Sequence, residues 1–281
     1  LMNFYKKENP NSLFVAGGVH PTVRSQECLD AGFDVVVKGE GEIALEKICD
    51  LWRNGKEVPK VFSEPQHKPL DDFPFPDYKA IGADSYEFNI NGKNAFSVIT
   101  SRGCPYTCNF CSSPLMWEKQ VRLHSFEYVR GLIQGLQKDF GLEAIMFQDD
   151  VFPMDKQRMT QITNFLKQED ITYRCLIRAN MMTEETIQLL KGTGCVEVGV
   201  GIESFDGTML KNMDKHTSPE VNARAIDTAK KYGMPVKAFI LYGIPGETHE
   251  TIKNTMDMLE LHPPDDVDAN VLYPYPGTDY R

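Results

Sequence analysis

The sequence predicts an α/β fold built on a largely parallel sheet. From about residue 94 onward, short apolar runs alternate with helical stretches, and the near-continuous runs are typical of strands buried on both faces of a sheet. The 281 residues, 41% of them hydrophobic, are enough for a sizeable core. No Gly-x-Gly-x-x-Gly follows any expected strand, which counts against a dinucleotide-binding sheet. Six strand–helix repeats therefore indicate either a doubly wound sheet or a barrel.

The first part of the chain has a different character from the rest. Residues 1–59 are expected to form about half of an open α/β sheet, with strands at 13–16 and 34–37. A turn over Gly17–Thr22 follows the first strand, and an amphipathic helix follows Gly39–Glu42. Half a sheet is too little to close its own core, so this part is expected to need a neighbour.

A second domain is expected over residues 94–281, joined to the first by a proline-punctuated linker over residues 60–93. Thr217–Glu220 is interpreted as a capping box with an early proline, Thr183 opens another helix, and Gly233 ends one. The strands of this domain are expected at 95–100, 143–147, 173–177, 195–200, 236–241 and 268–272.

Composition excludes several classes of protein. Forty acidic and 30 basic residues give a net charge of −10, which argues against a binder of duplex nucleic acid. The chain has no apolar run long enough to span a membrane and no secretory signal, so a cytoplasmic protein is expected. It starts at Leu1 and ends shortly after a strand-like run, so both ends are expected to be cut from a longer protein.

Three of the seven cysteines form a motif, Cys104-Pro-Tyr-Thr-Cys108-Asn-Phe-Cys111. The odd number of cysteines argues against a disulfide framework, and a thioredoxin-like pair would need only two. A structural zinc would need a fourth ligand, for which His124 is a candidate. Three thiolates also suit a [4Fe–4S] cluster with one open iron, which would be a catalytic site. The other cysteines are interpreted as small buried hydrophobes: Cys28, Cys49, Cys175 and Cys195.

Polar residues recur where the expected strands end. In a barrel, chemistry gathers at the carboxyl ends of the strands, so a ring of such residues predicts an active site at one mouth. The residues at these positions are Cys104, Asp149, Asp150, Arg178, Glu203 and the turn Gly243–Glu247.

The cysteine motif, with Thr100–Gly103 before it and Phe110 before its last cysteine, resembles the cluster loop of the radical S-adenosylmethionine (SAM) superfamily. Further along, similar stretches are Phe147–Phe152, Gly199–Ser204, Gly243–Thr248 and Tyr273–Thr278. The resemblance implies a partial (β/α)6 radical SAM barrel.

The first part of the chain is similar to the C-terminal half of an open-sheet cobalamin-binding domain. Gly17-Gly18-Val19-His20-Pro21-Thr22 and Val37–Glu42 carry this resemblance. It implies that Gly17, Gly18 and His20 line the lower face of a cobalamin site, although a histidine in a turn often has no such role. The family's cobalamin-ligating Asp-x-His-x-x-Gly loop is expected upstream of Leu1, so cobalamin binding is assigned to the full-length parent.

The superfamily resemblance assigns roles at the barrel mouth. Cys104, Cys108 and Cys111 would hold a [4Fe–4S] cluster, and SAM would chelate its fourth iron. At least one of Asp149 and Asp150 would accept hydrogen bonds from the SAM amino group; otherwise they cap a helix or repel each other, with one facing the pocket.

The same resemblance extends to the nucleoside and carboxylate of SAM. Arg178 would pair with the carboxylate, or else with Glu203 or an aspartate. Glu203 would bind the ribose hydroxyls, or else form a structural pair. Phe110 is assigned to the cofactor site with the cysteine motif, while Gly243 and Gly246 would approach the adenine or simply form a tight turn. Tyr273 and Tyr275 face either the substrate side or the barrel filling.

The resulting prediction is an enzyme that cleaves SAM reductively and abstracts hydrogen from an unactivated carbon, for cobalamin-dependent methyl transfer, cyclisation or rearrangement. The resemblance also implies a small-molecule substrate and a low-potential electron donor such as a flavodoxin or ferredoxin; no catalytic side chain is predicted. One alternative is a relative without cobalamin that performs another radical modification. The other is a non-catalytic iron–sulfur or zinc protein of electron transfer or assembly.

Overall fold

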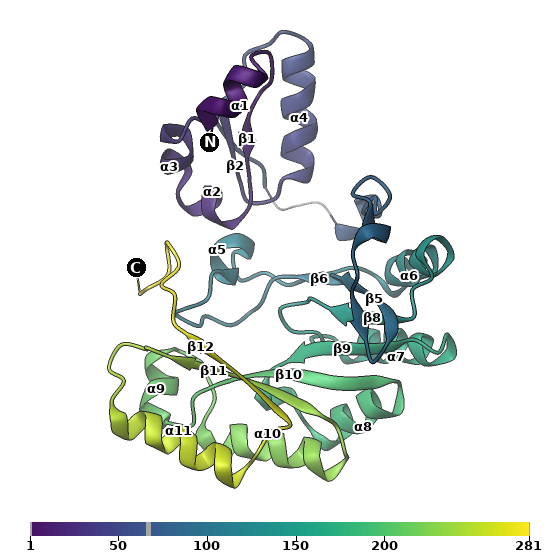
Figure 1. Ribbon diagram of the computed structural model, residues 1–281, viewed down its shortest axis with the longest axis vertical. Helices are drawn as coiled ribbons and strands as arrows, with labels where there is room; N and C mark the ends of the chain where they lie inside the picture. The colour runs from purple at the N-terminus through teal and green to yellow at the C-terminus, as the bar shows by residue number, and fades with distance from the viewer. Residues whose placement is uncertain (1, 66–68, 281) are drawn as a thin grey trace.

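Two separate parallel sheets carry the fold. In the computed structural model, which describes residues 2–65 and 69–280, an N-terminal unit lies over a larger sheet with its helices (Figure 1). The unit contains β1 (Val15–Ala16), β2 (Val35–Lys38) and β3 (Val61–Ser63), all parallel and in that order. Its helices are α1 (Met2–Glu8), α2 (Val19–Val23), α3 (Ser25–Asp30) and α4 (Glu42–Arg53).

The central strand of this unit, β2, is buried on both faces. Val35 and Val37 pack against Ala44 and Ile48 of α4, while Val36 packs on the opposite face with Ala16 and Cys28. Because successive side chains of a strand point to opposite faces, the three consecutive valines serve two small cores. The unit is thus a helix–sheet–helix layer of limited size.

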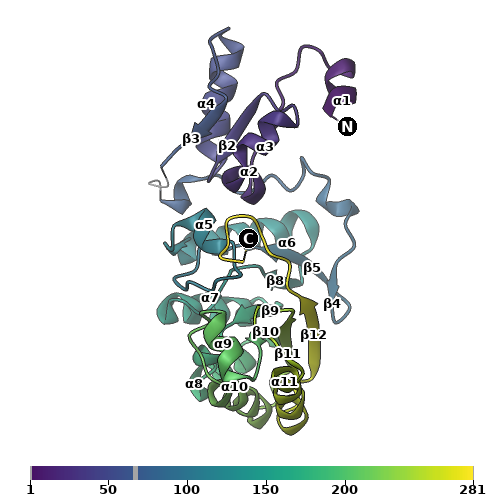
Figure 2. The same cartoon turned by 90° about the vertical axis from the view of Figure 1, so that its left-hand side faces the viewer.

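The larger sheet has seven strands in the order β12-β11-β10-β9-β8-β5-β4. β4 (Asn89–Ile90) pairs antiparallel with β5 (Lys93–Val98), and all other pairs are parallel. The sheet curls into a half-barrel, and most of its helices lie along the outer side (Figure 2). The remaining strands are β8 (Ala144–Phe147), β9 (Thr172–Ile177), β10 (Cys195–Glu203), β11 (Val236–Tyr242) and β12 (Asp266–Val271).

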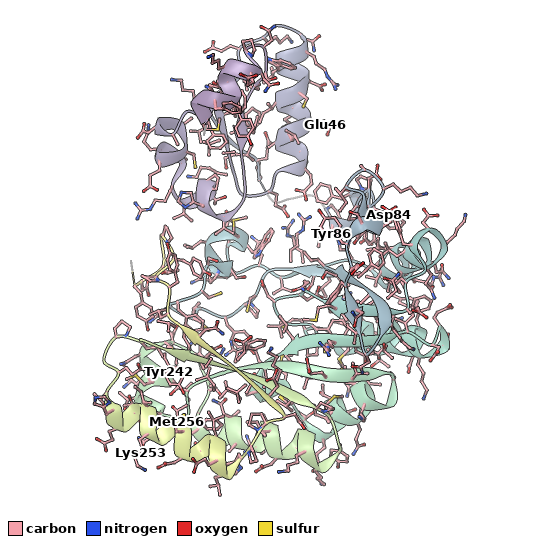
Figure 3. All side chains as sticks on the ribbon, viewed as in Figure 1. Glu46, Asp84, Tyr86, Tyr242, Lys253 and Met256 are labelled. Atoms are coloured by element: carbon pink, nitrogen blue, oxygen red, sulfur yellow. The ribbon has the colours of Figure 1, made fainter. Side chains whose placement is uncertain are left out.

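The helices of the half-barrel cover its outer face and form the main core with it. Apolar side chains of α6 (Phe126–Phe140), α7 (Lys156–Gln168), α8 (Glu184–Gly192) and α10 (Pro219–Lys231) pack against the outward residues of the strands. α11 (His249–Leu261) joins this layer, and the Tyr242 hydroxyl donates to the Met256 sulfur at 3.5 Å (Figure 3). The short helices are α5 (Ser113–Trp117), α9 (Gly207–Asn212), η1 (Leu70–Asp72), η2 (Ala83–Ser85) and η3 (Ala179–Met181).

The strands of the half-barrel are less completely buried than the sequence predicts. In β9, Tyr173, Cys175 and Ile177 are buried against the helices, but Thr172, Arg174 and Leu176 alternate with them and stay partly open. The inner face of a half-barrel is not closed by opposing strands, so its side chains keep some exposure. This inner face is the one available to a ligand.

Two local predictions differ from the structure, and the expected linker contains short strands. The stretch 60–93 contains β3, which extends the first sheet, and β4, which extends the second. The expected turn after β1 forms the short helix α2. Ser218 caps α10 and Pro219 opens it, but the expected box does not form because Glu220 precedes the N3 position; Thr248 and Thr251 form such a box at α11.

A small antiparallel ribbon joins the cysteine motif to the half-barrel. β6 (Ser101–Arg102) pairs with β7 (Arg122–Leu123). Gly103 follows β6 with a φ of +96°, and a Cβ there would lie 1.8 Å from the Gln120 carbonyl oxygen. Only glycine fits this position, so the ribbon fixes where the cysteine loop (residues 104–111) begins.

Candidate functional site

A cavity of about 210 Å³, here called the cysteine cavity, lies at the carboxyl ends of β8 to β11. The cysteine loop forms one wall, and the inner face of the sheet forms the other. Parallel strands place their carboxyl ends at one edge, so residues far apart in sequence meet there. Its charged and sulfur-bearing lining residues are Cys104, Cys108, Cys111, Asp150, Arg178, Glu203 and Lys215.

All three cysteines of the motif line this cavity. Burial raises the pKa of Cys104 and of Cys111, and the neighbouring Cys108 adds to the rise in both. Two donors reach the sulfurs: Arg178 Nη1 lies 3.6 Å from Cys108 Sγ, and the Ser113 amide donates to Cys111 Sγ at 3.4 Å. Such donors favour the thiolate forms that metal binding requires. As the side chains stand, the described residues contain no group of three His, Cys, Asp or Glu arranged to hold a metal ion.

Arg178 lines the cavity and follows directly after the end of β9. Its guanidinium carbon lies 3.5 Å from the centre of the Tyr106 ring, and Nη2 donates to the Lys215 carbonyl. Among the described residues, neither an aspartate nor Glu203 pairs with it, so the structure does not show the alternative of a structural ion pair. Its buried Nε has no hydrogen-bond partner among the residues that the structure describes. An unsatisfied buried guanidinium nitrogen is costly, which suits a site that receives an acceptor.

Glu203 pairs with a lysine that sequence reasoning missed. Lys215 Nζ donates to Glu203 Oε1 at 2.7 Å, and the two side chains are only 8% and 12% exposed. Glu203 ends β10 at a bulge, with a φ of +61°, and this turns its carboxylate toward the cavity. At Gly201 an added Cβ would lie 2.6 Å from Glu203 Oε1 and 2.8 Å from Lys215 Nζ. The glycine therefore leaves the space that the ion pair fills.

The two adjacent aspartates have different surroundings. Asp149 is fully buried outside the cavity lining; it accepts from the Thr100 amide and hydroxyl, both at 2.5 Å, and from the Ser101 amide at 3.2 Å. Burial raises the pKa of Asp149 against these hydrogen bonds. These bonds tie the segment after β8 to Thr100 and Ser101, which follow β5, and Asp149 does not line the cysteine cavity. Asp150 lines the cavity and accepts from the Ser113 hydroxyl at 2.6 Å.

Phe110 lines the cysteine cavity, but the expected glycine turn does not. Phe110 also packs against an apolar cluster of α9 residues and Ile244, so it connects the cysteine loop to that cluster. Gly243 donates its amide to Glu247 at 2.8 Å, and Gly246 has a φ of +88° beside Asn212. Both glycines shape a tight turn that supports the cluster behind Phe110.

A second cavity of about 330 Å³, the inter-unit cavity, lies between the N-terminal unit and the half-barrel. Gly18 and the segment Gly39–Glu42 line it from above, and Asp150 lines it from below. Gly17 is not part of this lining, and a Cβ added to it would meet Val37 Cβ at 3.8 Å, an ordinary contact distance. His20 lies outside the lining and faces Glu27 at 3.5 Å, so the structure separates it from the cavity.

The remaining candidates lie elsewhere. His124 is buried against Asp71, 3.0 Å away, and is stacked on Tyr128, so it does not complete a ligand set with the cysteines. Tyr273 and Tyr275 form an exposed edge-on pair and do not fill the barrel. The isolated cysteines Cys28, Cys175 and Cys195 are buried and Cys49 is partly buried.

Comparison with known families agrees with this geometry. Residues 98–259, more than half of the chain, match the profile of the Radical SAM superfamily. The chain belongs to the radical SAM superfamily. Residues 1–49 match the B12 binding domain, and this match covers most of the N-terminal unit.

Curated relatives match this chain along nearly its whole length. An uncharacterized methyltransferase, PH0819, of Pyrococcus horikoshii is 34% identical over 97% of this chain and 63% of its own length. An anaerobic magnesium-protoporphyrin IX monomethyl ester cyclase of Rubrivivax gelatinosus is 25% identical over 98% of this chain and 53% of its own. The chain thus spans roughly half to two thirds of the length of these relatives.

Solved radical SAM structures share the fold. The methyltransferase TsrM of Kitasatospora setae, solved with tryptophan and a SAM analogue, has a TM-score of 0.73 at 18% identity and covers 91% of this chain and 54% of its own. OxsB, solved with aqua-cobalamin and SAM, has a TM-score of 0.73 at 20% identity and covers 92% and 41%. In the part of this protein that the structure describes, no helix is long and apolar enough to cross a membrane.

Proposed function

We propose that the protein cleaves SAM reductively in the cysteine cavity and abstracts hydrogen from a small-molecule substrate, for cobalamin-dependent methyl transfer or cyclisation. The observation that carries the proposal is that three thiols, two cations and Glu203 share one cavity at the strand ends. When bound, a [4Fe–4S] cluster supplies the single electron that splits SAM into methionine and a 5′-deoxyadenosyl radical. A low-potential donor such as a flavodoxin or ferredoxin would provide that electron.

Cys104, Cys108 and Cys111 would hold the cluster, since all three open onto the same cavity. Arg178 and the Ser113 amide already donate to two of the sulfurs, and such donors stabilise a thiolate ligand set. The three thiols leave one iron for SAM, whereas an electron carrier encloses its cluster with a complete ligand set.

The other lining residues suit the parts of SAM. Arg178 has an unpartnered buried Nε among the described residues, and a carboxylate would satisfy it. Glu203 would accept from the ribose hydroxyls, with Lys215 holding its charge in place. Asp150 would accept from the SAM amino group, and Phe110 would close the apolar side. Water exclusion by these walls would protect a radical from quenching.

The N-terminal part, residues 1–59 together with β3, would form the cobalamin-binding side, and residues 94–281 the radical SAM side, with 60–93 between them. Gly17, Gly18 and Gly39–Glu42 lie at the carboxyl ends of β1 and β2, the edge of an open sheet where ligands bind. The inter-unit cavity separates these loops from Asp150. This arrangement would put a methyl donor within reach of a substrate at the barrel mouth.

Metal content and electron paramagnetic resonance test the proposal. Anaerobic reconstitution of the chain should give about four irons and four sulfides per chain and no zinc, as expected for a [4Fe–4S] cluster. Adding SAM to the reduced protein should change the resonance spectrum, because SAM occupies the open iron. Cys108→Ala should lose the cluster, whereas Cys49→Ser, outside the cavity, should keep it. One zinc without labile sulfide would contradict the proposal.

A further inference from the structure

A cluster of four charges crosses the boundary between the N-terminal unit and the half-barrel. Glu40 follows β2, and Arg122 Nη1 and Nη2 donate to its two carboxylate oxygens at 2.9 and 2.7 Å. Arg102 Nη1 donates to the same carboxylate at 2.5 Å, while its Nη2 reaches Glu42 at 2.6 Å. The carboxylates belong to one unit and the guanidinium groups to the other.

Glu40 and the two arginines are largely withdrawn from water, whereas Glu42 stays exposed. The Glu40 side chain is only 10% exposed, and the Arg102 guanidinium carbon lies 5.5 and 5.8 Å from the ring centres of Phe73 and Trp117. Burial opposes the ionisation of Glu40, yet the hydrogen bonds from Arg122 and Arg102 outweigh it and lower its pKa. Bidentate guanidinium–carboxylate pairs fix orientation as well as distance, which lysine would not do.

The cluster reaches the site through the backbone. Arg102 and Arg122 are paired across the β6–β7 ribbon, and Gly103 joins that ribbon directly to Cys104. Arg102 and Glu40 both line the inter-unit cavity. The position of the N-terminal unit is thus coupled to the strand from which the cysteine loop starts.

A second contact between the units is apolar and less directional. A Cβ at Gly277 would lie 2.5 Å from Val23 of α2 and 3.1 Å from Leu115 of α5, so the final turn passes closely between these helices. Figures 1 and 2 both show this segment beside α5, below the N-terminal unit. Apolar contact excludes water but permits sliding, whereas the charge cluster defines one register.

We propose that Glu40 is a positioning residue whose carboxylate, held by Arg102 and Arg122, sets the gap between the N-terminal unit and the cysteine cavity. Its effect on the reaction rests on the proposed function, because the two units then carry the two reactive groups. We call the contact of Glu40 with Arg102 and Arg122 the latch. Its loss would let the two units separate while each keeps its own fold. Glu40 contacts no group of the cysteine cavity and acts through Arg102.

Distance measurement tests the latch without using activity. Nitroxide-bearing non-natural residues replace the exposed Lys56, in the N-terminal unit, and Gln188, on α8, so no cysteine is touched. Pulsed electron–electron double resonance on the full chain should give a narrow distribution of distances between the two nitroxides. In Glu40→Gln the separated population should rise by about tenfold, since one member of a buried charge pair is lost.

Three further variants make the test specific. Arg122→Gln, on the other unit, should raise the separated population as much as Glu40→Gln does. The double variant should raise it little further, because both substitutions remove the same interaction. Glu64→Gln is the matched control: its 2.8 Å pair with Lys47 lies within the N-terminal unit, so its distribution should remain that of the wild type. Unchanged distances in Glu40→Gln, or an equal change in Glu64→Gln, would overturn the proposal.

Measuring 5′-deoxyadenosine and modified substrate then distinguishes a failure of the latch proposal from a failure of the proposed function. If the wild type cleaves SAM, Arg122→Gln, at a residue that lines neither the cysteine cavity nor the inter-unit cavity, should still release 5′-deoxyadenosine from its intact half-barrel but lose coupling to substrate modification in the full-length protein. Coupling equal to that of the wild type would contradict the positioning role. A wild type that never cleaves SAM would refute the proposed function alone, since the distance measurement still judges the latch.

Discussion

Two cations and two carboxylates line the cysteine cavity, and they are not equally satisfied. Lys215 is paired with Glu203, and Asp150 accepts from Ser113, but Arg178 rests on Tyr106 and keeps one nitrogen unpartnered among the described residues. A buried guanidinium without a carboxylate is electrostatically incomplete. The cavity is therefore prepared for an anionic group next to the thiols, as the carboxylate of SAM would supply.

Substitution of Glu203 by Gln tests its role toward SAM. Glutamine keeps the shape but loses the charge, so the Kd for SAM should rise by about tenfold or more, the effect of a charge-assisted hydrogen bond. Calorimetric titration of the reconstituted chain measures this change, and iron content should stay constant. Glu197→Gln is the matched control, because Glu197 lies on the same strand but pairs with Arg174 at 3.5 Å. Equal affinity of Glu203→Gln and the wild type would exclude Glu203 from SAM binding.

At the residue scale, the sequence indicated most of the cavity but not how its charges pair. Cys104, Arg178 and Glu203 were predictable because each follows an apolar run. Lys215 belongs to no motif, and only the path of the chain after α9 brings it to Glu203. Asp149 and Asp150 are consecutive, so no periodicity tells which of them faces the cavity. Tyr106 lies within the cysteine motif, and its ring could have been considered as a partner for a cation.

At the scale of elements, α6 shows how local sequence and packing contribute separately. Val129, Leu132, Ile133 and Leu136 give the buried stripe, Ser125 caps the first turn, and Gly141 ends the helix with a φ of +66°. Tertiary packing of this stripe provides most of the stability of such a helix. The interior of α6 contains two glycines, of which Gly135 is exposed and Gly131 is partly buried.

Gly135→Ala should stabilise the protein by about 0.5–1 kcal/mol, because alanine has less backbone entropy to lose in a helix. A Cβ at Gly135 meets nothing within 4 Å. Gly131→Ala is the paired comparison: its Cβ would lie 3.0 Å from the Phe75 ring, which offsets the same entropic gain. Urea unfolding compares the variants. A Gly135→Ala midpoint at or below that of the wild type would contradict this account of α6.

The strength of sequence patterns explains which elements were predictable. The six strands with long apolar runs lie within a few residues of the expected positions. β3 and β4 are three and two residues long, and periodicity cannot identify strands that short. Their assignment depends on neighbours, β2 and β5, that complete the hydrogen bonds.

At the scale of the whole molecule, the contact between the two units depends on charges far apart in the sequence. Glu40 lies 62 residues from Arg102 and 82 from Arg122. No local pattern joins these positions, so the placement of the N-terminal unit could not be predicted from the sequence. The kind of fold that this unit adopts could be predicted, because Val37–Glu42 carries a recognisable motif.

The latch should make the stability of the apo chain depend on acid pH. The pKa of Glu40 in the fold lies below its ordinary value of 4.5, despite burial, because Arg122 and Arg102 donate to the carboxylate. Its contribution is present above pH 4.5 and is lost as pH falls through the lowered pKa, since the unfolded chain then binds the proton first. Thermal unfolding at several pH values should show the advantage of the wild type over Glu40→Gln shrinking in that window. A constant difference from neutral to acid pH would contradict the sign.

The central claim is that the cysteine cavity cleaves SAM, and one product reports on it directly. The anaerobically reconstituted chain, given SAM and a low-potential reductant, should accumulate 5′-deoxyadenosine, quantified by liquid chromatography and mass spectrometry. Cys108→Ala should give only background, and Cys49→Ser should match the wild type. Wild-type chain with a full complement of iron and sulfide that forms no more 5′-deoxyadenosine than Cys108→Ala would contradict the claim.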